Sequence, residues 1–221
     1  VHGEGLLLIP EGEPVADIVA LPDCEQTPEM LAGLAEGIPA ESQFARRLAE
    51  SGCRVIIPVL INRQVEQHGR AKLSNREYLY RSAFELGRHL TGYEIQKVLA
   101  CVDWFEKESG RPIGVVGSGE GGRLSLFCGA IDPRIDTVGA SGYFDKRESL
   151  WQEPIDRNVY GLLEQFGDAE LATMVWPRTL VVEAAKGPEG EMDRGTVGGP
   201  GRLVSPTPEN VEAELARAGE L

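Results

Sequence analysis

A glycine-dense turn in the middle of the chain has the residue types and spacing to do chemistry. Residues 113–122 read Ile-Gly-Val-Val-Gly-Ser-Gly-Glu-Gly-Gly, an apolar run followed by a sharp turn, and a helix is predicted to open at Gly121. A strand, a tight turn and a helix can form a catalytic elbow that exposes one side chain, or a phosphate cradle at a helix N-terminus. The flanking residues must distinguish these two possibilities.

The phosphate interpretation depends on Gly117, Gly119 and Gly122, which spell G-x-G-x-x-G, a pattern that binds the pyrophosphate of NAD or FAD. The pattern normally opens its domain, whereas here several predicted strands and a long helix precede it. The ribose-binding acid should end the next strand about twenty residues on. Asp136 lies at the beginning of that predicted strand rather than at its end, and Asp145 lies too far along. Dinucleotide binding is therefore the less favoured alternative.

Strand and helix signals alternate along the chain, so the turn is expected to belong to an α/β fold with a mostly parallel sheet covered on both faces. Short apolar runs predict strands at 5–10, 17–21, 53–61, 113–118, 135–141 and 178–184. Apolar residues at helical spacing predict helices at 42–51, with Ser42 as N-cap, at 76–108, interrupted near Gly87 and Gly92, and at 209–218. A polar loop is predicted at 62–75 and an irregular helical region at 150–166.

The turn also resembles the nucleophile elbow of the α/β-hydrolase fold, G-x-Nu-x-G-G. The resemblance extends over roughly 18–183. Before the turn, an L-G-x-x-x-x-G segment at 86–92 starts a helix that ends in Val-Asp-Trp-Phe at 102–105, and Ala-Ile-Asp-Pro-Arg-Ile follows at 130–135. These segments, with the late strand at 177–182, are similar to acetyl xylan esterases and dienelactone-hydrolase-like proteins. The resemblance implies a three-layer fold and, in an active member, hydrolysis of carboxylic esters.

The nucleophile position of this elbow is occupied by glycine. Aligning the glycines places Gly119 where family members carry Ser or Cys. Ser118 is one residue out of register, because its neighbours two away are Val116 and Glu120 rather than small residues. We therefore interpret Ser118 as a hydrogen-bonding turn residue, and Glu120 as a solvated complement to the helix dipole. Cys128 lies on the apolar helix and is expected in the core.

The other parts of a Ser-His-acid relay are also missing from their expected places. The base should follow the last strands, yet the only histidines are His2, His68 and His89. Glu183 and Glu189 are available as the acid, but the chain is rich in acids. The loop after Leu21, where the resemblance places the oxyanion donors, carries Asp and Glu at 23 and 25, whose charges would repel an oxyanion.

Composition and net charge limit the classes of molecule that the chain is expected to bind. The 221 residues are 42% apolar, enough for a sizeable core, and carry a formal net charge of −13, which disfavours nucleic acid and anionic membranes. No apolar run approaches the roughly 18 residues of a membrane span. The four cysteines, at 24, 53, 101 and 128, form no C-x-x-C pair and are expected to be free thiols rather than zinc ligands. No cofactor or metal is expected.

These observations predict a domain at 1–186 with a degenerate elbow, followed by a Gly/Pro-rich tail and short acidic helix at 187–221. The chain lacks a starting Met, and its tail stands where the fold would place a last strand and the His. We therefore expect a piece of a larger protein that acts as a structural or ligand-binding module, with further domains or a carbohydrate as partners. The alternative is an ester hydrolase with an unorthodox site, or one completed by residues outside this piece.

Overall fold

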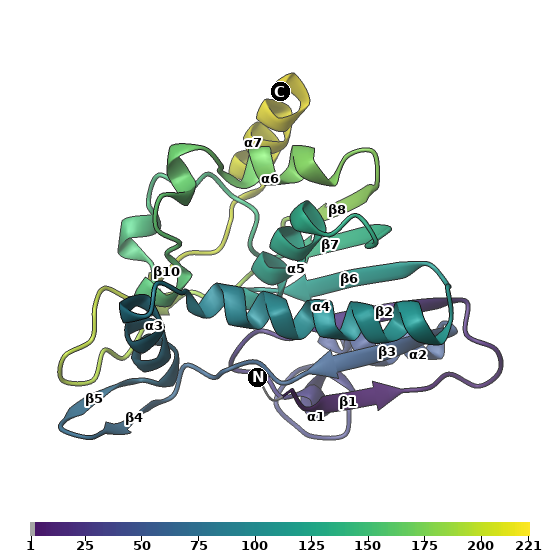
Figure 1. Cartoon of the computed structure of the whole chain (residues 1–221), viewed down its shortest axis with the longest axis horizontal. Helices are drawn as coiled ribbons and strands as arrows, with labels where there is room; N and C mark the ends of the chain where they lie inside the picture. Colours follow the sequence, from purple (N-terminus) through teal and green to yellow (C-terminus); the bar gives the residue numbers. More distant parts are fainter. Residues whose placement is uncertain (1–2) are drawn as a thin grey trace.

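A six-stranded sheet forms the centre of the molecule in the computed structural model, which describes residues 3–221 (Figure 1). The strand order is β1-β3-β2-β6-β7-β8, with β1 antiparallel to β3 and all other pairs parallel. The strands are β1 (Gly5–Leu8), β2 (Ala16–Leu21), β3 (Cys53–Pro58), β6 (Ile113–Ser118), β7 (Thr137–Ser141) and β8 (Thr179–Glu183). All six predicted strands are confirmed, with ends that differ by a few residues.

Helices cover the two faces of the sheet unequally. One face carries α4 (Leu90–Glu108), α5 (Glu120–Ile131) and α6 (Asp168–Val175), and the main apolar core lies between them and the strands. The other face carries, within the described residues, only the short α1 (Pro28–Leu31) and α2 (Phe44–Glu50), over β2 and β3. Val181 of β8 is 54% exposed, although parallel strands are usually buried on both faces. The outer end of the sheet is therefore uncovered on one side.

The break predicted within 76–108 is confirmed, because α3 (Asn75–Glu85) ends before α4 begins. Two local predictions are wrong. Residues 62–75 are not a loop: β4 (Val65–His68) and β5 (Ala71–Ser74) form a hairpin that projects from the sheet in Figure 1. Each strand has four residues and is mostly polar, with a two-residue turn between them, so the hairpin lacks the apolar run that predicts a strand. Ser42 is not the N-cap of α2, since Gln43 occupies that position without a side-chain cap.

The segment after β8 returns to the body of the molecule. Gly190–Glu191 (β9) pairs with Arg202–Leu203 (β10), and α7 (Pro208–Glu220) packs against α6. Thr196 N donates to Lys72 O at 2.7 Å, so the tail contacts the hairpin strand β5. Leu203 and Val211 are buried. The tail thus contributes side chains to the folded body, and the boundary at 186 stays a prediction.

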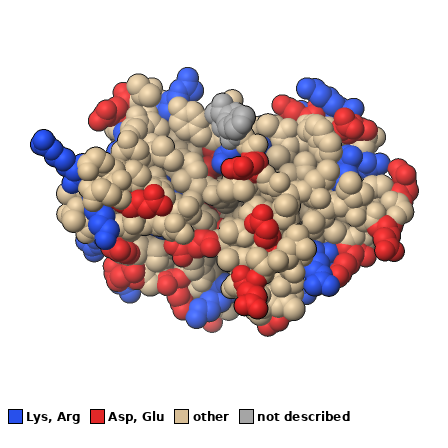
Figure 2. Space-filling view, turned by 90° about the horizontal axis from the view of Figure 1, so that it is seen from below, with Lys and Arg blue, Asp and Glu red and all other residues tan. Residues whose placement is uncertain are grey.

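Irregular structure at 150–166 agrees with the sequence: three single-turn 3₁₀ helices span Leu150–Gln152, Ile155–Arg157 and Leu162–Glu164. The four cysteines are free, and Cys128 is fully buried as predicted. Among residues 3–221, no helix is long and apolar enough to cross a membrane. On the face shown in Figure 2, basic and acidic side chains are interspersed over a largely uncharged surface.

Candidate functional site

The backbone at Gly119 has the geometry of an elbow. Gly119 joins β6 directly to α5 with φ 57° and ψ −117°, a conformation that an L side chain adopts only under strain. Its N–H donates to Ser141 O at 2.9 Å, and its carbonyl accepts from Arg123 N at 3.1 Å. In an active enzyme such a turn raises the nucleophile above the carboxyl end of a central strand. Here the raised position has no side chain.

Three neighbouring glycines are required by close packing. A Cβ on Gly117 would lie 2.2 Å from the Gly121 carbonyl carbon, and a Cβ on Gly121 would lie 2.2 Å from Leu21 O. A Cβ on Gly122 would lie 2.7 Å from Ser141 O. The first turn of α5 therefore packs directly against the ends of β2 and β7, and glycine is the only residue that fits at these three positions. These glycines have a structural explanation that needs no bound phosphate.

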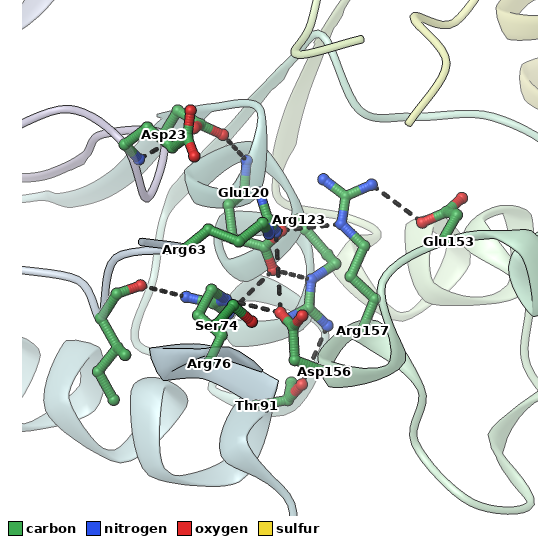
Figure 3. Close-up of polar contacts among 12 residues, drawn as sticks. Asp23, Arg63, Ser74, Arg76, Thr91, Glu120, Arg123, Glu153, Asp156 and Arg157 are labelled. Carbon is green, nitrogen blue, oxygen red and sulfur yellow. Dashed lines mark hydrogen bonds and ion pairs between the residues drawn. The ribbon is translucent and has the colours of Figure 1, made fainter. Parts of the chain in front are cut away.

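The carboxylate of Asp23 occupies the space in front of the elbow. Glu120 N, the first amide after the elbow position, donates to Asp23 Oδ2 at 3.0 Å (Figure 3). A Cβ on Gly119 would lie 2.5 Å from the same oxygen and 2.9 Å from Pro188 Cδ. In the α/β-hydrolase elbow the corresponding amide donates to the oxyanion. A fixed negative charge already accepts this hydrogen bond, and it would also repel a phosphate.

Glu120 is the centre of a buried ionic cluster, contrary to the prediction of a solvated residue at the helix end. Its carboxylate is fully buried, and guanidinium groups from four separate elements surround it, as Figure 3 shows. Oε1 accepts from Arg123 Nε at 2.6 Å and Arg76 Nη2 at 3.4 Å. Oε2 accepts from Arg157 Nε at 2.8 Å and Arg63 Nη2 at 3.0 Å. The cluster ties the loop after β3, α3, α5 and the 3₁₀ turn at Ile155–Arg157 to one point.

Three further carboxylates balance the cluster. Arg76 forms a two-pronged pair with Glu94 at 2.7 and 2.8 Å and also donates to Asp156 at 2.6 Å. Arg157 donates to Glu153 at 2.9 Å. Four guanidiniums therefore face four carboxylates, and most of these side chains are buried. Pairing of this kind is needed, because an unpaired charge in such a place is strongly destabilising.

The cluster fixes the protonation state of Glu120. Burial alone would raise its pKa, but the four surrounding guanidiniums outweigh burial and hold the pKa well below the usual range. The carboxyl group is ionised at neutral pH, and both of its oxygens accept hydrogen bonds from arginine. Glu120 thus has neither a proton to give nor a free lone pair facing a substrate, and it cannot serve as a general acid or base.

The remaining predicted site residues are not assembled into a relay. Ser118 is half-buried at the end of β6, next to the elbow, and its interpretation as a hydrogen-bonding turn residue stays a prediction. Glu183 ends β8 and accepts from Ser141 Oγ at 2.5 Å. Glu189 is exposed and pairs with Lys186 at 2.7 Å.

The histidines are engaged elsewhere. His68 stacks on Tyr78 of α3 with ring centroids 4.1 Å apart. His89 Nε2 accepts from Tyr160 N at 3.1 Å, at the N-terminus of α4. His2 lies outside the described residues. No histidine in the described part of the chain hydrogen-bonds a serine or carboxylate at the elbow.

The arginines of the cluster, at positions 63, 76, 123 and 157, were not predicted as site residues from the sequence. The only local signal is the spacing of Glu120 and Arg123, three apart on one helix. The other partners are 44 or more residues from Glu120 on one side, or 37 on the other, in segments with no helical pattern in common. Asp23 was anticipated only as an acid near the oxyanion loop.

The fold is shared with known esterases. A Bacteroides fragilis protein described as an acetyl xylan esterase superposes on this chain with a TM-score of 0.64 at 18% identity. The superposition covers 86% of this chain and 56% of that protein. Glucuronoyl esterases from Caldicellulosiruptor kristjansonii and Solibacter usitatus give TM-scores of 0.55 and 0.56 at 16% and 13% identity. These cover 97% and 98% of this chain but 61% and 64% of theirs.

The chain therefore has an α/β-hydrolase-like fold of the kind found in carbohydrate and carboxylic ester hydrolases, as the resemblance in sequence indicated. It spans less than two thirds of the length of these three esterases. No protein-family model matches the chain, and no curated protein matches it. At this level of identity the likeness defines the fold, and the chemistry must be argued from the site.

Proposed function

We propose that this chain is a catalytically degenerate α/β-hydrolase-like domain that serves as a structural or ligand-binding module of a larger protein. One observation carries the proposal: Gly119 leaves the nucleophile position empty, and Asp23 accepts the hydrogen bond of the oxyanion amide. Acyl transfer needs both a nucleophile and an electropositive site for the developing oxyanion. Gly119 supplies no nucleophile, and the neighbouring Asp23 makes the oxyanion position negative.

Two features support a role in binding or assembly. Ligands of open α/β sheets bind at the carboxyl ends of the strands, and the glycine turn lies at this end of the sheet. The uncovered side of β8, which exposes Thr179, Val181 and Glu183, leaves this end of the sheet open to contact with a further domain. The esterases that share the fold are named for acetyl xylan and glucuronoyl esters, which makes a carbohydrate a reasonable ligand class.

Turnover of p-nitrophenyl acetate tests the proposal directly. We expect no hydrolysis by the wild-type chain above the rate of heat-denatured protein, and no labelling by a serine-reactive phosphonate. The alternative is an ester hydrolase with an unorthodox nucleophile. It predicts turnover that Ser118→Ala or Ser141→Ala abolishes, while Ser82→Ala, an exposed serine on α3, retains it. Turnover with that pattern would overturn the proposal.

A gain-of-function variant tests the physical reason. Gly119→Ser restores a hydroxyl, but its Cβ would meet the Asp23 carboxylate at 2.5 Å. We expect the single variant to be inactive, and Gly119→Ser combined with Asp23→Ala to remain inactive because neither His68 nor His89, the histidines of residues 3–221, lies at the elbow. Measurable hydrolysis by the single variant would show that Asp23 does not block the site.

A further inference from the structure

A small polar cavity adjoins the empty elbow. It has a volume of about 140 Å³ and lies beyond the carboxyl end of β7, between 142–157 and the tail. Pro188, which would contact a Cβ on Gly119, forms part of its wall. The cavity is therefore at the edge of the sheet where an α/β fold binds its ligands. Its volume is well below the roughly 300 Å³ of pockets for drug-sized molecules, so it suits a small group.

The lining of this cavity is positively charged, although the chain carries a net charge of −13. Four basic side chains contribute, against the two acids Asp145 and Glu153; the basic residues are Lys146, Arg147, Arg157 and Arg202. Arg147 is fully engaged by Glu153, Asp168 and the Tyr143 carbonyl. Lys146 forms no ion pair within residues 3–221, and Arg202 reaches Glu191 only at 3.9 Å. The surplus charge is therefore available to a ligand.

The guanidinium of Arg157 is held in a fixed position, unlike a mobile charge on the surface. Its side chain is 6% exposed and is held by two carboxylates, with Nε on Glu120 at 2.8 Å and Nη1 on Glu153 at 2.9 Å. No hydrogen bond from its third nitrogen, Nη2, to any described residue is found. In Figure 3 this nitrogen points toward neither carboxylate. Arg157 lines the cavity, so a rigid, pre-oriented N–H donor without an acceptor in residues 3–221 lies at the cavity wall.

We propose that this cavity binds a small organic carboxylate, or the carboxylate end of a larger molecule, through Arg157 Nη2 with Lys146 and Arg202 at the rim. A carboxylate suits it better than a phosphate, because a second negative charge would face Asp145 and Glu153. The proposal names a ligand class for the module proposed above and rests on that function. A single buried charged donor with two exposed ones is expected to give affinity in the millimolar range.

Acetate and acetamide form a matched pair of probes, since they have the same shape and differ in charge. Each is titrated into the full chain at constant ionic strength, with sodium chloride as the balancing salt, and the ¹H–¹⁵N resonances of Gly142 N–H and Arg157 Nε–H are followed. We expect saturable shifts with acetate and none with acetamide. Equal shifts with both probes, or equal shifts with chloride, would overturn the proposal.

Variants at the rim locate the site. Val204 lines the cavity and is 68% exposed, so Val204→Glu places a competing carboxylate there without disturbing the core, and it should weaken acetate binding at least about tenfold. Lys146→Gln and Arg202→Gln should each weaken it by up to about fivefold. Lys186→Gln removes an exposed lysine outside the cavity and should leave binding unchanged. Unchanged binding in Val204→Glu and Lys146→Gln would refute the site.

The two proposals fail separately. Ester turnover would end the non-catalytic assignment while leaving the acetate titration as it stands. Absence of acetate binding would remove the carboxylate site while leaving Gly119 and Asp23 as the reason for missing catalysis.

Discussion

Glu120→Gln tests whether the ionic cluster holds the elbow region together. The substitution keeps the shape of the side chain and removes one negative charge, so four buried guanidiniums would face three carboxylates. Removing one member of a buried charge pair costs about 3–5 kcal/mol of unfolding free energy. For a chain of this size each kcal/mol corresponds to roughly 2–4 °C, so the midpoint of thermal unfolding should fall by about 6–20 °C.

Urea unfolding at pH 7, followed by circular dichroism, measures this change. Glu50→Gln is the matched control, because Glu50 pairs with Arg46 at 2.8 Å on the surface, with 59% of its side chain exposed. Such exposed pairs contribute about 0.5 kcal/mol or less. A loss below about 1 kcal/mol in Glu120→Gln, indistinguishable from the control, would refute the conclusion that the cluster stabilises the native state.

The effect should depend on pH in one direction. The pKa of Glu120 is lowered in the native state, so its charge contributes stability above the unfolded value of about 4.5, and this contribution is lost as pH falls through the native pKa. The difference between wild type and Glu120→Gln should therefore be constant between pH 5 and 7 and shrink below about pH 4. A difference that grows on acidification would contradict the assignment of an ionised Glu120.

Three further substitutions examine the tail and the long helix. Arg217→Gln should return the pKa of Glu170, which hydrogen bonds from Arg217 hold at about 2, toward its ordinary value near 4.5, as measured by ¹³C NMR titration; an unchanged pKa would mean that α7 does not contact α6 in solution. Leu203→Ala should cost about 2–5 kcal/mol in urea unfolding, against less than about 1 for the exposed Leu34→Ala, whereas equal losses would make the tail a separate appendage. Gly92→Ala should stabilise the chain by about 0.5–1 kcal/mol, since α4 leaves open space there; destabilisation would show that the break before α4 needs glycine.

The sheet was predictable because its signals are local. Each strand is a short apolar run, and the amphipathic pattern of α4 is visible over five turns. What the sequence did not show are elements whose reason lies in distant contacts. The helix α6 has only eight residues, and its place depends on packing against α5 and α7. The β4–β5 hairpin is polar and is fixed partly by Thr196, 124 residues from its partner Lys72.

The same distinction holds at the site. The missing nucleophile could be predicted from one residue, Gly119, and the spacing of the glycines around it. The acids after Leu21 predicted a loop whose negative charge would repel an oxyanion. The contact between Asp23 and Glu120 joins positions 97 residues apart, so no pattern in the sequence could show that the carboxylate lies on the amide. Burial of Glu120 was equally hidden, because a charged residue at a helix N-terminus is normally solvated.

Retention of the elbow backbone without a nucleophile has a physical explanation in packing. In enzymes the strained turn persists because catalysis requires an exposed side chain. At Gly119 the positive φ costs little, since glycine adopts it freely. The close approach of α5 to β2 and β7 through Gly117, Gly121 and Gly122 requires a sharp turn at this point, and the Glu120 cluster anchors the helix that follows. The elbow is thus maintained by packing contacts beneath and behind it that involve no nucleophile.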